Sequence, residues 1–208
     1  MAPVKVKICG ITNIEDALAA VAAGADAIGL MLYEPSPRFV SLERAAEIVR
    51  ALPPFVAKVG VFVNASEQDV RRAIDDCGID TLQFHGEEPP EFCRRFSLKV
   101  IKAFRVQDAG SLDATREYPG TTWLLDSYVS GKHGGTGARL NWELAAGAVR
   151  SGGRVILAGG LTPENAAAAV RRVLPFGLDV SSGVESAPGK KDPAKIRAFI
   201  TAARLTTT

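Results

Sequence analysis

The chain has 208 residues, of which 47% are hydrophobic and 23% charged, and its formal net charge is +2. This length fits one domain with a substantial core, and we expect residues 1–208 to form a single domain. The nearly balanced charge argues against nucleic-acid binding, which needs concentrated basic surface. No apolar run reaches membrane-spanning length, and the N-terminus lacks the pattern of a signal peptide, so we predict no membrane association.

The cysteines and histidines are few and widely spaced, namely Cys9, Cys77, Cys93, His85 and His133. An odd number of scattered cysteines is typical of a reducing compartment, and no C-x-x-C or other metal-ligand spacing occurs. We therefore predict a cytoplasmic protein without a bound metal.

Apolar, β-branched segments alternate with alanine-rich segments of helical periodicity along the whole chain. The predicted strands are Val4–Cys9, Ala27–Leu32, Ala57–Val63, Thr81–Phe84, Leu98–Ala103, Thr121–Asp126, Arg154–Ala158 and Gly177–Val180. Strand–helix units that follow one another without a linker predict a compact α/β fold, the (β/α)8 TIM barrel, because right-handed crossovers let parallel strands close. An open doubly wound sheet is the alternative.

Capping signals predict where the helices begin. Thr12 and Glu15 have the spacing of a capping box for the first helix, and Ser41, Ser66 and Thr162 are expected N-caps of later ones. The helical pattern is weakest after the fifth strand.

Two side chains that can exchange protons stand at predicted strand ends, Cys9 on the first strand and Asp126 on the sixth. Active sites of such barrels lie at the C-terminal ends of the strands, so the two residues suggest acid–base chemistry. A cysteine that only packs in the core and an aspartate that only anchors a loop are the simpler interpretations.

Lys7 shares a face of the first strand with Cys9, because side chains alternate with a period of two. A lysine inside a barrel needs an anionic partner, and closure places Asp179 of the eighth strand beside it. We expect a Lys7–Asp179 pair below the site, and we expect Lys7 to favour the thiolate of Cys9.

Glycine- and serine-rich turns follow the last two predicted strands. Barrels often bind phosphate there, and glycine lets backbone N–H groups approach an anion. A longer glycine-rich loop over residues 127–137 is expected to act as a lid with backbone donors. Turn geometry alone is the simpler explanation. The predicted phosphate-binding residues are Gly135, Gly159, Gly160, Ser181, Ser182 and Gly183.

Further side chains are expected to line the same rim as substrate-binding residues. Arg38 lies in a proline-rich loop after the second strand, where its guanidinium could clamp a carboxylate. Gln83 and His85 share a face at the end of the fourth strand, and Asp179 completes the set. A solvated arginine and a histidine bound to a loop carbonyl are the simpler interpretations.

Taken in order, eight motifs of this chain resemble phosphoribosylanthranilate isomerase over effectively the whole sequence. Each motif is common among phosphate-binding barrels, but their order, with cysteine on the first strand and aspartate on the sixth, is specific. The motifs are Lys7–Thr12, Pro35–Arg38, Val59–Asn64, Gln83–Gly86, Leu125–Ser127, Gly134–Gly137, Ala158–Leu161 and Asp179–Glu185.

The resemblance implies a cofactor-independent Amadori rearrangement in tryptophan biosynthesis, from N-(5-phosphoribosyl)anthranilate to 1-(2-carboxyphenylamino)-1-deoxyribulose 5-phosphate. It implies Asp126 as the general acid and Cys9 as the general base. It also implies Arg38 on the anthranilate carboxylate and the last two strand-end loops on the phosphate. An acid and a base that work at one pH need surroundings that shift their pKa values in opposite directions.

Other functions stay open at this point. A histidine-pathway Amadori isomerase would carry an aspartate in place of Cys9, and indoleglycerol-phosphate synthase would need a catalytic lysine, for which Lys58 and Lys102 are candidates. A phosphosugar-binding barrel without activity would not need both Cys9 and Asp126. The sequence fits a monomer or a homodimer with a small phosphosugar as its ligand.

Overall fold

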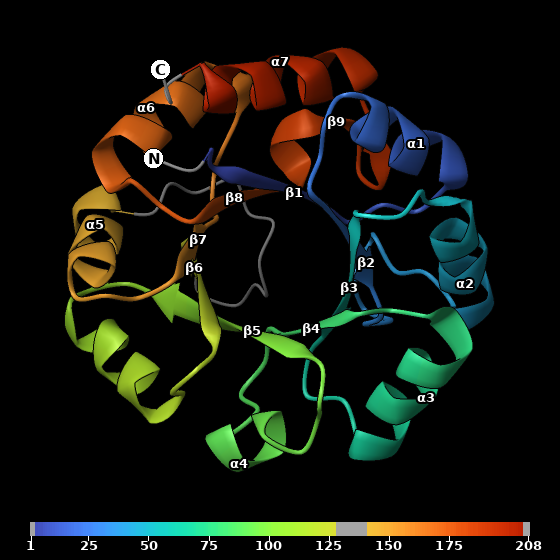
Figure 1. Cartoon of the computed structure of the whole chain (residues 1–208), viewed down its shortest axis with the longest axis horizontal. Coiled ribbons are helices and arrows are strands. Elements are labelled where there is room, and N and C mark those ends of the chain that lie inside the picture. Colours follow the sequence, from blue (N-terminus) through green and yellow to red (C-terminus); the bar gives the residue numbers. More distant parts are fainter. Residues whose placement is uncertain (1–2, 128–140, 206–208) are drawn as a thin grey trace.

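A computed structural model describes residues 3–127 and 141–205 of the chain. Parallel strands close into a barrel in the order β1 to β8, so the predicted (β/α)8 barrel is confirmed and the open sheet is wrong (Figure 1). Each strand lies within a few residues of its predicted position. The strands are β1 (Lys5–Cys9), β2 (Ala27–Met31), β3 (Ala57–Phe62), β4 (Thr81–Phe84), β5 (Lys99–Val106), β6 (Thr122–Ser127), β7 (Val155–Leu157) and β8 (Gly177–Val180).

Helices surround the barrel (Figure 1). After β5 the connection is a 3-10 helix, η1 (Gly110–Glu117), where the sequence pattern was weakest. A short 3-10 helix, η2 (Ser182–Val184), and a hairpin of β9 (Glu185–Ala187) and β10 (Lys190–Lys191) follow β8. The α-helices are α1 (Ile14–Ala22), α2 (Leu42–Ala51), α3 (Glu67–Cys77), α4 (Pro90–Cys93), α5 (Trp142–Arg150), α6 (Pro163–Val173) and α7 (Pro193–Arg204).

The helix starts follow most of the capping signals. Ser41 and Ser66 are N-caps as predicted, and each hydroxyl accepts a backbone N–H of its helix. The capping box expected for α1 is wrong, since Asn13 is the N-cap and its side chain accepts a backbone N–H at 2.7 Å. Thr12 instead donates its hydroxyl to the carbonyl of Gly189 at 2.6 Å, and so ties the start of α1 to the β9–β10 hairpin.

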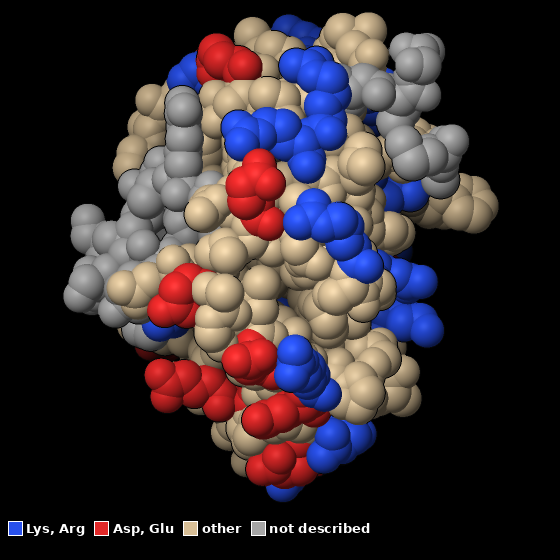
Figure 2. All heavy atoms as spheres, turned by 90° about the vertical axis from the view of Figure 1, so that its left-hand side faces the viewer, with Lys and Arg blue, Asp and Glu red and all other residues tan. Residues whose placement is uncertain are grey.

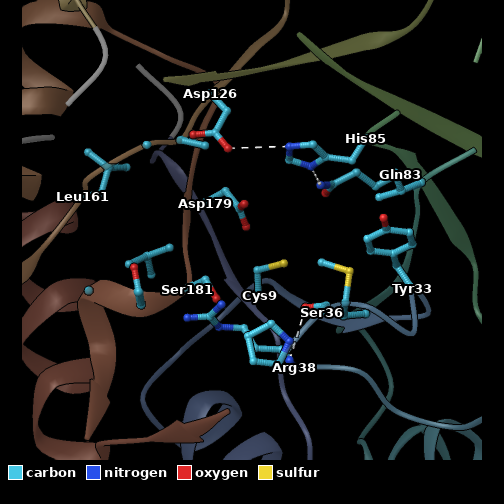
Figure 3. A pocket seen from close by; sticks show the side chains of 18 of the residues that line it. Cys9, Tyr33, Ser36, Arg38, Gln83, His85, Asp126, Leu161, Asp179 and Ser181 are labelled. Atoms are coloured by element: carbon cyan, nitrogen blue, oxygen red, sulfur yellow. Dashed lines mark hydrogen bonds and ion pairs between the residues drawn. The ribbon is translucent and has the colours of Figure 1, made fainter. Parts of the chain in front are cut away.

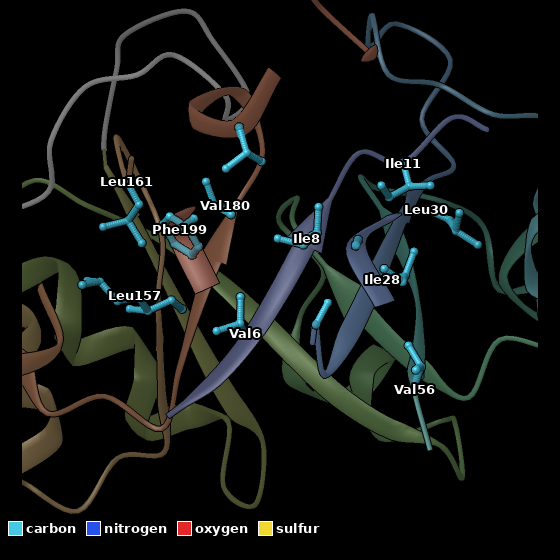
Figure 4. Packing of buried hydrophobic residues seen from close by; sticks show 14 of the residues in the cluster. Val6, Ile8, Ile11, Ile28, Leu30, Val56, Leu157, Leu161, Val180 and Phe199 are labelled. Carbon is cyan, nitrogen blue, oxygen red and sulfur yellow. The ribbon is translucent and has the colours of Figure 1, made fainter. Parts of the chain in front are cut away.

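The alternation of side chains along β1 divides the core into an outer and an inner part. Val6 and Ile8 belong to the outer cluster between barrel and helices, as does Phe199 of α7 (Figure 4). Cys9 belongs to the cluster inside the barrel. Each fully buried side chain of the size of isoleucine contributes about 1.5–3 kcal/mol, so this burial fixes which face of β1 turns inward. Lys7 and Cys9 are therefore held inside the barrel by the packing of their neighbours.

The outer surface carries mixed charge. Figure 2 shows lysine and arginine side chains interspersed with aspartate and glutamate on the face that lies at the left of Figure 1. Within the described part of the chain, no helix combines the length and the apolar character needed to cross a membrane.

Candidate active site

A cavity of about 400 Å³ opens at the C-terminal ends of the strands, a size suited to a small-molecule ligand (Figure 3). Every candidate site residue that the structure describes lines it. Gly135 and the predicted lid from residue 128 onward lie outside the described residues. The candidates brought together are Cys9, Arg38, Gln83, His85, Asp126, Gly159, Gly160, Asp179, Ser181, Ser182 and Gly183.

The predicted Lys7–Asp179 pair is confirmed. The two residues are direct partners in the β1–β8 register, and Lys7 Nζ donates to Asp179 Oδ1 at 2.8 Å. Both side chains are buried. Burial lowers the pKa of Lys7, but Asp179 and Cys9 together outweigh it and raise the pKa to about 12. Lys7 is therefore a fixed cation beneath the pocket.

The thiol of Cys9 is buried beside this pair and faces the cavity. Gly29 on β2 leaves the space for it, because a Cβ at that position would lie 2.8 Å from Cys9 Sγ. Burial raises the pKa of the Cys9 thiol, Lys7 opposes this and Asp179 adds to it. Lys7 lowers the pKa of Cys9, as predicted, but the increase caused by burial is larger.

Asp126 points into the cavity from β6, across from Cys9 (Figure 3). His85 Nε2 lies 3.6 Å from Asp126 Oδ2, and Gln83 Nε2 lies 3.0 Å from His85 Nδ1. The donor and acceptor roles of Gln83 and His85 depend on the imidazole tautomer, and His85 Nε2 lies near the carboxyl group beyond hydrogen-bond distance. The interpretation of His85 as a partner of a loop carbonyl is wrong, because its ring contacts these two side chains.

Arg38 reaches the pocket from the loop after β2 and is not a solvated side chain. Its Nε and Nη2 each donate to one carboxylate oxygen of Glu185, both at 2.8 Å. Gly10, with φ of +72°, makes room for it, because a Cβ there would lie 2.5 Å from Arg38 Cδ. No sequence pattern predicts Glu185 as this partner, since 147 positions separate the two residues.

The loops after β7 and β8 pack against each other and form one wall of the pocket. A Cβ at Gly183 would overlap the carbonyl oxygen of Leu161, so only glycine fits at this contact. Asn165 braces the first loop: its Nδ2 donates to Gly160 O at 2.9 Å, and its Oδ1 accepts from the backbone of Thr162, the predicted N-cap, at 2.9 Å. Asn165 was not predicted, although its spacing from Thr162 is that of a capping box.

The lysines that would suit indoleglycerol-phosphate synthase are both outside the set of pocket-lining residues. Lys58 pairs with Asp80 at 3.2 Å. The buried ammonium of Lys102 donates to Gly86 O at 2.7 Å and to Glu88 Oε2 at 3.1 Å, where it ties strand-end loops together. Neither lysine is placed to react with a ligand in the cavity.

Titratable side chains that converge at the C-terminal ends of barrel strands define a (β/α)8-barrel enzyme. Residues 6–202 match the family model of N-(5'-phosphoribosyl)anthranilate (PRA) isomerase. The chain belongs to this family and is an isomerase of tryptophan biosynthesis. The expected fold, family and activity are thereby confirmed.

Relatives of known name match over nearly their full length. The chain is 54% identical over 203 residues to N-(5'-phosphoribosyl)anthranilate isomerase of Pelobacter propionicus, covering 98% of this chain and 97% of that one. It is 43% identical to the crystal structure of phosphoribosyl anthranilate isomerase from Thermotoga maritima, with a TM-score of 0.90 and coverage of 96% and 98%. A further structure of phosphoribosyl anthranilate isomerase, in complex with reduced 1-(o-carboxyphenylamino)-1-deoxyribulose 5-phosphate, is 42% identical, with a TM-score of 0.87 and coverage of 96% and 98%.

Proposed function

We propose that Cys9 and Asp126 catalyse the Amadori rearrangement of N-(5-phosphoribosyl)anthranilate to 1-(2-carboxyphenylamino)-1-deoxyribulose 5-phosphate. The observation that carries this proposal is that both side chains face one cavity of substrate size from different strands. A base and an acid on separate sides of a ligand can act on different atoms of it.

The reaction then follows from the two groups. The carboxylic acid of Asp126 protonates the furanose ring oxygen, the bond from C1 to that oxygen breaks, and the nitrogen lone pair forms an iminium at C1. The thiolate of Cys9 removes the proton from C2, and the electrons of that bond neutralise the iminium to give an enolamine. Tautomerisation adds a proton to C1 and leaves the ketone at C2. No net oxidation occurs, so no cofactor is needed.

The remaining candidates bind the substrate in this proposal. Arg38 binds the anthranilate carboxylate with the guanidinium N–H groups that do not donate to Glu185. Asp179 faces the sugar ring between Cys9 and Asp126 (Figure 3), and Gln83 and His85 line the pocket beside the acid. Backbone N–H groups of Gly159, Gly160 and Ser181–Gly183 bind the phosphate. The product analogue bound by the related structure combines the same carboxylate, sugar chain and phosphate.

The assay of this proposal follows the consumption of N-(5-phosphoribosyl)anthranilate by the purified protein. Cys9→Ala and Asp126→Asn are each expected to lower kcat by roughly 10²-fold or more, since each removes one proton transfer. Cys77→Ala is the matched control, because Cys77 is also buried but lies outside the pocket. Near-normal turnover by either active-site variant would remove that residue from the mechanism.

Location and assembly remain predictions. We expect the protein to work in the cytoplasm as a monomer or homodimer, without nucleic acid or membrane as a partner. Light scattering on the purified chain measures the mass in solution and distinguishes the two oligomeric states.

A further inference from the structure

A fully buried lysine lies behind Arg38, and nothing in the proposed chemistry uses it. The side chain of Lys191, on β10, is 0% exposed. Its Nζ donates to Glu185 Oε1 at 2.8 Å and to the carbonyl of Ser181 at 3.2 Å. Glu185 is the carboxylate that holds Arg38, so one acidic group bridges two cations. Arg38 lines the pocket, while Glu185 and Lys191 lie behind it, outside the pocket lining.

The charges of this cluster do not cancel. Arg38 and Lys191 are cations and Glu185 is an anion, which leaves one net positive charge; burial lowers the pKa of Lys191, and its hydrogen bond to Glu185 opposes this. Burial alone would raise the pKa of Glu185, but the hydrogen bonds from Arg38 and Lys191 outweigh it and hold that pKa below its ordinary value. Without Lys191 the cluster would be a neutral ion pair. A neutral pair attracts an anionic ligand less than a cluster with an excess cation does.

The hairpin that carries Lys191 is anchored on several sides. The backbone N–H of Lys191 donates to Asp16 Oδ2 at 2.9 Å, and Lys195 Nζ donates to the carbonyl of Glu185 at 2.8 Å. Thr12 binds the turn of the hairpin through Gly189. A lysine is almost never buried fully unless it is paired, and the desolvation cost of an ion is several kcal/mol. Its pairing with the buried carboxylate of Glu185 offsets this cost, so Lys191 and Glu185 form one buried unit behind Arg38.

We propose that Lys191 is a positioning residue for the substrate carboxylate. Its ammonium group fixes Glu185, Glu185 fixes the guanidinium of Arg38, and the excess positive charge makes this wall selective for an anionic group on the aromatic ring. This proposal rests on the proposed role of Arg38.

The test is a pair of stable ligands whose Kd is measured by calorimetry. One is reduced 1-(o-carboxyphenylamino)-1-deoxyribulose 5-phosphate, and the other is the same compound without the ring carboxylate. Lys191→Met is expected to weaken binding of the first ligand roughly 10-fold, the effect of one charge-assisted contact, and to leave the second within about 2-fold. Lys190→Met is the matched control, because its exposed neighbouring side chain should affect neither ligand.

The outcomes separate the two proposals. If Arg38→Met weakens both ligands equally, the proposed role of Arg38 is wrong. If Arg38→Met selectively weakens the carboxylate ligand but Lys191→Met weakens both or neither, only the inference about Lys191 is overturned. Lys191→Gln keeps a hydrogen bond without the charge, and it replaces Lys191→Met should the latter not fold. Failure of both variants to fold also overturns the inference, because Lys191 would then serve the fold rather than the site.

Discussion

The two sides of the pocket are built differently. On the Cys9 side, ion pairs between separate elements set the charge: Lys7 with Asp179 across β1 and β8, and Arg38 with Glu185 across a loop and a hairpin. On the Asp126 side, the carboxyl group lies 3.6 Å from the imidazole of His85, which can both donate and accept a proton.

Substitutions on the two sides of the pocket should therefore have different effects: a loss of stability on the Cys9 side and a loss of turnover on the Asp126 side. Each ion pair on the thiol side joins segments distant in sequence; Lys7–Asp179 is buried and Arg38–Glu185 is partly buried, so the loss of either should weaken the fold as well as the site. His85 and Gln83 lie two positions apart on one strand end, and changing them should disturb the reaction more than the fold. Equal losses of stability for variants on the two sides would contradict this expectation.

The largest effect is expected for Lys7→Met, which leaves the buried carboxylate of Asp179 without its partner. Removing one member of a buried pair costs about 3–5 kcal/mol in the free energy of unfolding. Lys5→Met is the matched control, since Lys5 lies on the same strand and also pairs with an aspartate, Asp26, but is exposed. It should cost about 1 kcal/mol or less. Urea unfolding measures both, and equal losses would contradict the importance of burial.

Next in size are substitutions of His85, which test the acid side. Lysine at this position adds a permanent positive charge beside Asp126, which favours the ionised carboxylate and so removes the proton it must donate. His85→Lys is expected to lower kcat roughly 10²-fold, and the uncharged His85→Gln about 10-fold. Steady-state assays at one pH, with thermal unfolding as the check on folding, measure the contrast. Similar turnover by the two variants would show that charge at this position does not govern the acid.

A smaller effect is expected in the reactivity of Cys9. Because burial raises the pKa of this thiol, its alkylation by iodoacetamide at pH 7 should be slower than that of free cysteine, whose pKa is about 8.5. The rate should rise with pH beyond that value. Cys9→Ala gives the background from the other two cysteines. Alkylation faster than free cysteine at pH 7 would mean that Lys7 and the neighbouring cations outweigh burial.

The sequence predicted those features of the structure that follow from a repeating pattern of apolar and polar residues. The strands follow from β-branched segments, and the period of two placed Lys7 and Cys9 inside the barrel; closure then brought Asp179 to Lys7. Contacts made by inserted elements could not be predicted in this way. Glu185 and Lys191 lie on a hairpin that follows no periodic rule, and their partners are set by how that hairpin folds over α1 and β8.

The smallest effect concerns Cys93, a buried cysteine of the helix layer that tests burial without active-site charges. Burial raises its pKa from 9.0 to about 11, with Lys102 opposing this in part. A thiol whose pKa is raised by folding stabilises the protein fully below its unfolded pKa and loses that contribution as pH rises. Stability should therefore decline between pH 9 and 11, and Cys93→Ala should flatten the decline, whatever it costs at neutral pH. Urea unfolding across this range measures it. An unchanged slope in Cys93→Ala would show that burial alone does not hold this thiol neutral, and would weaken the same explanation for Cys9.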